Sequence, residues 1–147
     1  MYEHLLVPVD GTEISERAMS ASIGLARKLN AAITGFVAEP DITLPSVGRH
    51  PSVVLRENAE AEAAAASHAR KVLAEFRARA AAAGVTFHGH FVRTQLVDDA
   101  IVQAARDHHC DLIVMVTHGR GAFGELLFGS HTKNVLARSQ LPLLVLH

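Results

Sequence analysis

The sequence predicts one α/β domain over residues 1–147, a doubly wound, five-stranded parallel sheet with helices on both faces. Two observations predict this fold class. Short, continuous apolar runs alternate with longer segments of helical periodicity, and such runs are typical of strands that are buried on both faces. In addition, consecutive parallel strands need a crossover between them, which is usually a helix and is right-handed.

The first elements follow directly from this alternation. A strand is expected over 4–9 (HLLVPV), where Asp10 and Gly11 supply a turn. Over 12–30 apolar residues recur every three or four positions, which predicts a helix capped by Thr12 or, alternatively, by Ser15. Residues 31–39 (AAITGFVAE) then predict the second strand.

The middle of the chain begins with residues 40–53, which contain three of the five prolines and predict a loop. The alanine-rich run over 54–83 predicts a long helix that stops at Gly84 and has a weak apolar stripe from Leu55 to Phe76. Residues 85–92 (VTFHGHFV) alternate between apolar and polar side chains. This alternation predicts a strand at an edge of the sheet, with one less buried face.

The last third predicts a helix over 96–109, a strongly apolar strand over 111–116, a helix over 130–139 and a final strand over 141–147. No second core, repeat or domain linker is evident. In doubly wound sheets, ligands bind beyond the carboxyl ends of the strands, where the strand order reverses. The segments 8–10 and 115–119 are the candidate strand ends for such a site.

The composition disfavours several classes of protein, namely nucleic-acid-binding, membrane and disulfide-bonded proteins. The net charge is -1, from 14 basic and 15 acidic side chains, which disfavours nucleic acid or an anionic membrane as a partner. The N-terminal segment lacks the pattern of a secretory signal, and no run approaches a membrane span of about 20 apolar residues. Cys110 is the only cysteine, so an intrachain disulfide cannot form. We therefore expect a soluble, cytoplasmic protein.

A glycine-rich segment, 116–133 (VTHGRGAFGELLFGSHTK), separates the fourth strand from the last helix. Gly119 and Gly121 permit tight backbone, and the helix that starts at Ser130 would direct N–H groups of its first turn at an anion such as phosphate. Alternatively, the glycines only form turns and Ser130 only caps the helix. The spacing does not match the GxxxxGK[ST] phosphate loop.

Together these segments resemble the universal stress protein family along the whole chain. The resemblance is carried by 5–15 (LLVPVDGTEIS), by 111–136 and by 142–147 (PLLVLH). The family's nucleotide-binding signature is Gly, two residues, Gly, nine residues, Gly and then Ser or Thr; its last three positions fall on Gly119, Gly129 and Ser130. The resemblance implies a Rossmann-like sheet with strand order 3-2-1-4-5. It also implies a dimeric stress-response protein that binds ATP or a related adenine nucleotide as a sensor or switch.

Val116 stands where the signature has its first glycine. Its branched side chain would narrow the site and would disfavour a positive φ. Either Val116 points aside and the nucleotide still binds, or the site is closed and the chain is a dimeric interaction protein that binds no nucleotide. A second departure is Gln95-Leu96-Val97, where the family commonly has Gly-x-Pro.

By resemblance, the cofactor would be ATP, ADP or AMP, with Mg²⁺ or Mn²⁺ bridging phosphate oxygens. Asp10 would bind the adenine or ribose side, or else only stabilise the following turn. Val37 and Met115 would be apolar walls or plain core, and His118 could reach a γ-phosphate or simply pack. The expected nucleotide-binding residues are Pro8, Val9, Asp10, Val37, Met115, Val116, His118, Gly119, Arg120, Gly129, Ser130, His131 and Thr132.

No residue pattern identifies a catalyst, so slow ATP hydrolysis or autophosphorylation is the most that we expect. No metal site is expected either, because His108, His109 and Cys110 are adjacent and diverge at a helix end. Cys110 is predicted to be a small buried hydrophobe. The last strand is very apolar for a strand at a sheet edge. In the family that the chain resembles, this strand pairs with the same strand of a second protomer. A homodimer through Leu143, Leu144, Val145 and Leu146 is therefore expected.

Overall fold

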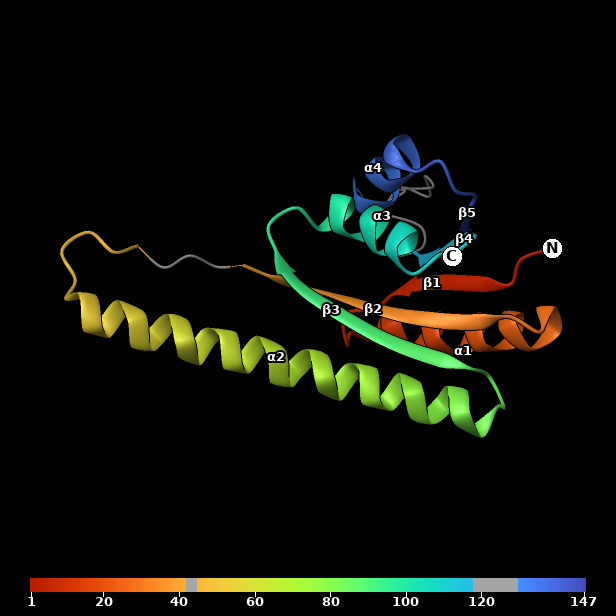
Figure 1. Cartoon of the computed structure of the whole chain (residues 1–147), viewed down its shortest axis with the longest axis horizontal. Coiled ribbons are helices and arrows are strands. Elements are labelled where there is room, and N and C mark those ends of the chain that lie inside the picture. Colours follow the sequence, from red (N-terminus) through yellow and green to blue (C-terminus); the bar gives the residue numbers. More distant parts are fainter. Residues whose placement is uncertain (42–44, 118–129) are drawn as a thin grey trace.

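The computed structural model describes residues 1–41, 45–117 and 130–147, and these form a five-stranded sheet in the order β3-β2-β1-β4-β5 (Figure 1). Every strand pair is parallel. The predicted fold class and strand order are therefore confirmed. The elements are β1 (His4–Pro8), α1 (Glu13–Leu29), β2 (Ala32–Pro40), α2 (Pro51–Ala82), β3 (Phe87–Thr94), α3 (Val97–Asp107), β4 (Leu112–Val116), α4 (Ser130–Arg138) and β5 (Leu143–Leu146).

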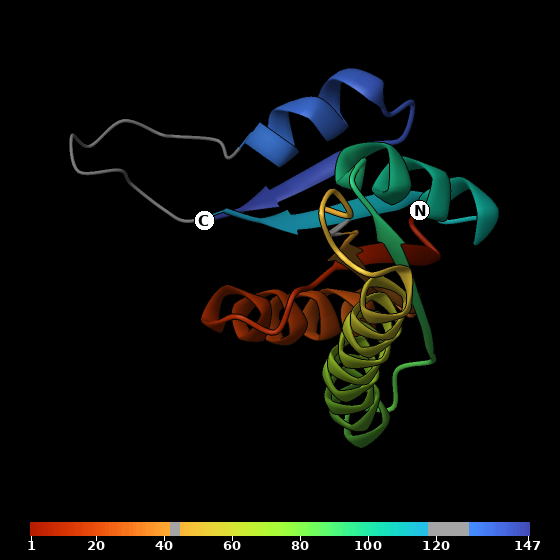
Figure 2. The ribbon, with the colours of Figure 1, turned by 90° about the vertical axis from the view of Figure 1, so that its left-hand side faces the viewer.

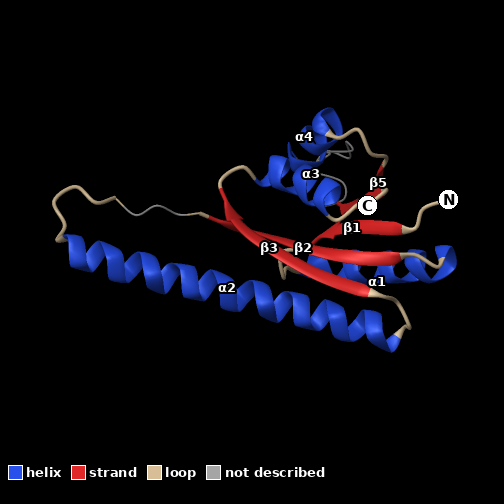
Figure 3. Cartoon of the chain, viewed as in Figure 1, coloured by secondary structure: helices blue, strands red, loops and turns tan. Residues whose placement is uncertain are grey.

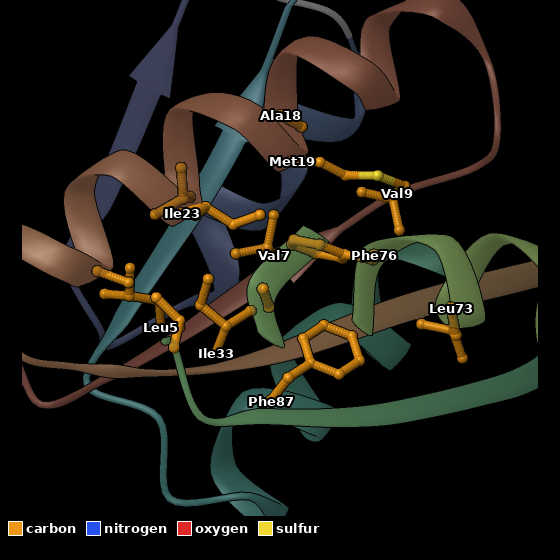
Figure 4. Packing of buried hydrophobic residues seen from close by; sticks show 14 of the residues in the cluster. Leu5, Val7, Val9, Ala18, Met19, Ile23, Ile33, Leu73, Phe76 and Phe87 are labelled. Atoms are coloured by element: carbon orange, nitrogen blue, oxygen red, sulfur yellow. The ribbon is translucent and has the colours of Figure 1, made fainter. Parts of the chain in front are cut away.

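The helices form one layer on each face of the sheet, with α1 and α2 on one side and α3 and α4 on the other (Figures 2 and 3). Successive side chains of β1 point to opposite faces, as the geometry of a strand requires. Leu5 and Val7 join the core under α1 and α2, which Figure 4 shows, whereas Leu6 joins the core under α3 and α4. The continuous apolar run of β1 follows from this burial on both faces.

Helix α2 begins at Pro51, so part of the predicted loop 40–53 is helical. Proline suits the first turn of a helix because it needs no N–H partner there, and the His50 side chain accepts a hydrogen bond from the Ser52 N–H. The predicted apolar stripe is correct only in the second half of the helix, since every buried residue of α2 lies at or beyond Ala69. The first half extends past the sheet, which leaves Leu55 exposed (Figure 1).

The two outer strands of the described sheet are β3 and β5. The predicted edge position of the VTFHGHFV segment is confirmed, although β3 runs over Phe87–Thr94 instead of 85–92. The structure also confirms the four-residue core of the last predicted strand, whose side chains are all partly exposed. Among the described residues, no helix is both long enough and apolar enough to cross a membrane.

Candidate functional site

A pocket of about 490 Å³ lies at the carboxyl ends of β1, β2 and β4, where the strand order reverses between β1 and β4. The structure brings together most of the predicted nucleotide-binding residues that it describes. Those that line the pocket are Pro8, Val9, Asp10, Val37, Met115, Val116, His131 and Thr132. Ser130 begins α4 but does not line the pocket. His118, Gly119, Arg120 and Gly129 lie outside the described residues.

Asp10 is held by the turn that connects β1 to α1. Its Oδ1 accepts hydrogen bonds from the Thr12 N–H at 3.0 Å, the Thr12 hydroxyl at 2.6 Å and the Ser15 hydroxyl at 2.7 Å. Burial alone would raise the pKa of Asp10, but these hydrogen bonds outweigh it and lower that pKa. The carboxylate is therefore an ionised acceptor that stabilises the turn and also lines the pocket.

The same network decides how α1 begins. Thr12 occupies the N-cap position, as predicted, but its side chain makes no capping hydrogen bond and instead donates to Asp10. The Ser15 hydroxyl accepts from the backbone N–H groups of Asp10 and Gly11, at 2.7 and 3.1 Å. Asp10 and Ser15 thus shape one wall of the pocket.

Val116 is the last residue of β4 and pairs with Leu146. Among the described residues other than glycine, only Asn30 and His109 have positive φ, so Val116 has ordinary strand backbone and its predicted conflict with positive φ does not arise. Its side chain packs in part against the core under α1 and α2. Val116 lines the pocket, and the described residues leave a volume of about 490 Å³ there.

The N-terminus of α4 forms another wall. Thr132 is buried, whereas the side chain of His131 is exposed and bonds through Nδ1 to Asp98 of α3. Asn134 donates to the other oxygen of Asp98 at 2.7 Å. The first turn of α4 contains no acidic residue that would offset the positive end of the helix dipole. The helix dipole therefore favours an anion at these backbone N–H groups, although the Asp98 carboxylate of α3 already contributes negative charge beside this helix end.

Three polar residues of the pocket are outside the predicted set: Ser15 in α1, Glu39 at the end of β2 and His68 in α2. Glu39 follows Val37 by two positions, and this spacing in a strand could have indicated that both lie on the same face. No local signal could have indicated His68, because its position depends on where α2 crosses the sheet. Val97 also lines the pocket, at the end of the segment that departs from the family's Gly-x-Pro.

Four histidines away from the pocket form ring contacts on the α3 side of the sheet. The His4 and His88 ring centroids are 5.8 Å apart, and those of His90 and His108 are 4.9 Å apart. Burial lowers the pKa of both His4 and His90, and neighbouring histidines lower it further, which favours neutral rings. Within ranges 1–41, 45–117 and 130–147, no group of three His, Cys, Asp or Glu side chains could hold a metal ion.

Cys110 is buried, as predicted, and burial raises the pKa of its thiol to about 11. The thiol is thus protonated at neutral pH, and a protonated thiol is a poor nucleophile. The side chain packs in the core under α3 and α4 as an apolar group.

The fold and the pocket define a doubly wound α/β protein with a pocket at the carboxyl edge of the sheet, where proteins of this architecture bind ligands. The comparisons with known proteins then identify the family. The model of the universal stress protein family matches residues 1–147, and the chain belongs to that family.

Relatives span nearly all of the chain. Universal stress protein MJ0531 of Methanocaldococcus jannaschii is 26% identical over 150 residues, covering 99% of this chain and 82% of the relative. A universal stress protein solved in complex with cAMP is 28% identical, with a TM-score of 0.70 and coverage of 99% and 97% of the two chains. The universal stress protein from Archaeoglobus fulgidus solved with dAMP is 19% identical, with a TM-score of 0.63 and coverage of 99% and 98%.

Proposed function

We propose that this chain binds ATP, ADP or AMP in the pocket and acts as a stress-response sensor or switch. The observation that carries the proposal is the pocket itself, which remains about 490 Å³ beside Val116. Ligand pockets in proteins typically measure about 300–1,000 Å³. Relatives that contain cAMP or dAMP support the adenine class of ligand.

In this proposal the phosphates lie at the N-terminus of α4, where the N–H groups of His131 and Thr132 and the helix dipole favour negative charge. The nucleoside lies between Asp10 and the apolar walls formed by Val37 and Met115. His118, Gly119, Arg120, Gly129 and Ser130 complete the proposed set. Any Mg²⁺ or Mn²⁺ would arrive with the nucleotide and neutralise charge on its phosphate oxygens.

Replacing Val116 by glycine is expected to tighten ATP binding by about tenfold, equivalent to about 1.4 kcal/mol, because the side chain narrows one wall of the pocket. Isothermal titration calorimetry of the wild type and Val116→Gly with ATP and Mg²⁺ measures this change. The control is Val47→Gly, since Val47 is 94% exposed and outside the pocket. Equal affinities for wild type and Val116→Gly would contradict the steric argument.

If neither protein shows saturable binding, the nucleotide proposal fails. The chain would then be the alternative, a dimeric interaction protein of the same fold without nucleotide. Turnover of ATP above background would instead indicate an enzyme and would require a catalytic residue to be found.

We also propose that the chain forms a homodimer through β5. The strand is the last of the described sheet and consists of Leu143, Leu144, Val145 and Leu146, all partly exposed. An apolar edge strand favours pairing with another chain, and pairing with an identical strand would give a two-fold symmetric interface.

Val145→Glu is expected to weaken dimerisation by at least about tenfold, because it places a charge in an apolar interface. Val145 is the suitable position, since Leu143, Leu144 and Leu146 pack against the two cores, whereas Val145 belongs to neither core of the described residues. Sedimentation velocity over a concentration series measures the monomer–dimer equilibrium, with Val47→Glu as the surface control. A wild-type protein that is monomeric at about 100 μM would refute the dimer proposal.

A further inference from the structure

A carboxylate and an imidazole face each other on the α2 side of the pocket. The Nδ1 atom of His68 forms a hydrogen bond with Oε1 of Glu39, and both residues line the pocket. The Glu39 side chain is only 12% exposed, whereas that of His68 is 49% exposed. A ligand in the pocket would therefore contact the pair from the side on which His68 is exposed.

Gly11 makes room for His68. Its φ is +82°, and a Cβ atom there would lie 3.0 Å from Nε2 of His68 and 2.8 Å from Cγ2 of Val72. Glycine is thus required both by the backbone and by the approach of α2 to the turn after β1. The imidazole ring lies between the carboxyl ends of β1 and β2. Its Nδ1 bonds to Glu39 of β2, and its Nε2 lies beside Gly11 in the turn after β1.

The charges around the pocket indicate which half of a nucleotide this pair would meet. The described residues that line the pocket include the carboxylates of Asp10 and Glu39 but no lysine or arginine. Phosphate groups would be repelled at Glu39, whereas the N-terminus of α4 favours them. The Glu39–His68 pair therefore faces the nucleoside half in the proposed binding mode.

The chemistry of the pair restricts the groups that it can recognise. An ionised carboxylate only accepts hydrogen bonds, so Nδ1 of His68 must carry the proton that the two residues share. Oε2 of Glu39 is then an acceptor, and Nε2 of His68 is a second acceptor as long as the ring is neutral. Two neighbouring acceptors complement a group that offers two donors.

We propose that Glu39 and His68 determine ligand specificity by selecting a nucleoside group with two hydrogen-bond donors. Two hydrogen-bond donors are offered by the exocyclic amine of adenine and also by the 2′- and 3′-hydroxyls of ribose. A carbonyl oxygen at the position of the amine, as in inosine, offers no donor and would face the acceptors unpaired. This inference rests on the proposed nucleotide function and adds the residues that distinguish one nucleoside from another.

The test is a comparison of affinities by isothermal titration calorimetry with ATP, ITP and 2′,3′-dideoxy-ATP. We expect the wild type to favour ATP over ITP, or over the dideoxy analogue, by about tenfold or more. Glu39→Gln exchanges an acceptor for a donor at nearly constant shape and is expected to bring that ratio close to one. His68→Gln is the second variant and is expected to reduce the same ratio.

Two controls separate specificity from affinity and folding. Glu60→Gln lies on an exposed part of α2 and should leave all three affinities unchanged. His131→Gln keeps the backbone N–H at the proposed phosphate end and changes only a side chain that bonds to Asp98, so it should leave the ATP/ITP and ATP/dideoxy-ATP ratios unchanged. A melting curve of each variant shows that it is folded.

The outcomes distinguish the two proposals. If the ratio of ATP to ITP affinity depends on Glu39, the pair binds the adenine amine. If the ratio of ATP to dideoxy-ATP affinity depends on Glu39, the pair binds the ribose hydroxyls. Either result supports the role of the pair in ligand specificity. Nucleotide binding with both ratios the same in wild type and Glu39→Gln overturns the role of the pair alone. No binding by the wild type or by Val116→Gly overturns the proposed function, and the role of the pair with it.

Discussion

Replacing Phe76 by alanine is expected to lower the free energy of unfolding by about 3–5 kcal/mol. Phe76 is fully buried, and its ring centroid lies 4.8 Å from that of Phe87 on β3 (Figure 4). The other buried residues of α2 are Ala69, Val72, Leu73 and Ala80, so Phe76 contributes the largest side chain of that face. Its removal would leave a cavity between α2 and the sheet.

Urea unfolding followed by circular dichroism measures this effect, and the melting temperature should fall by about 10 °C. The matched control is Leu55→Ala on the same helix. Leu55 is 70% exposed, so the change should stay within about 0.5 kcal/mol. A loss below about 1 kcal/mol for Phe76→Ala would mean that the second half of α2 is not held to the sheet by this ring.

The second large effect is expected at Gly35, in the middle of β2. A Cβ atom there would lie 2.6 Å from Cζ of Phe87 and 2.8 Å from Cδ1 of Phe76. Gly35→Ala should therefore destabilise the protein by about 2 kcal/mol, because two buried rings must move. The higher strand propensity of alanine is too small to offset this overpacking.

A double-mutant cycle tests the cause. If the new methyl group clashes with the ring of Phe76, the pair Gly35→Ala and Phe76→Ala should cost less than the sum of the two single changes. The control is Gly24→Ala in α1, where a Cβ would have no neighbour within 4 Å and should stabilise the helix by about 0.5–1 kcal/mol. Strict additivity of the pair would exclude contact with Phe76 as the reason.

Local patterns predicted most of the fold, because strands buried on both faces require continuous apolar runs and their crossovers require helices. The runs at β1 and β4 and the alternation at β3 were sufficient for the class, and the edge position of β3 followed from one polar face. The start of α2 was wrong, since Pro51 was assigned to a loop although it suits a first helical turn.

Some residues of the candidate site, too, could be predicted from local patterns, whereas others could not. Residues at the strand ends, such as Asp10 and Met115, could be predicted to share a pocket because parallel strands end at the same edge of the sheet. The effect of Val116 could not be predicted, since it depends on the backbone conformation that β4 adopts beside β5. The pairing of Glu39 with His68 could not be predicted either, because it joins residues from a strand and a distant turn of a helix.

By itself the sequence determined the order of helices and strands, the buried faces and the edge of the sheet where ligands are expected to bind. These properties depend on spacing along the chain, which is visible in the residues. Only the tertiary structure decided how far α2 extends past the sheet, that the described residues leave a pocket of about 490 Å³ beside Val116, and that His68 reaches Glu39. These properties depend on side chains that meet across distant segments, and their positions are set by the packing of the whole domain.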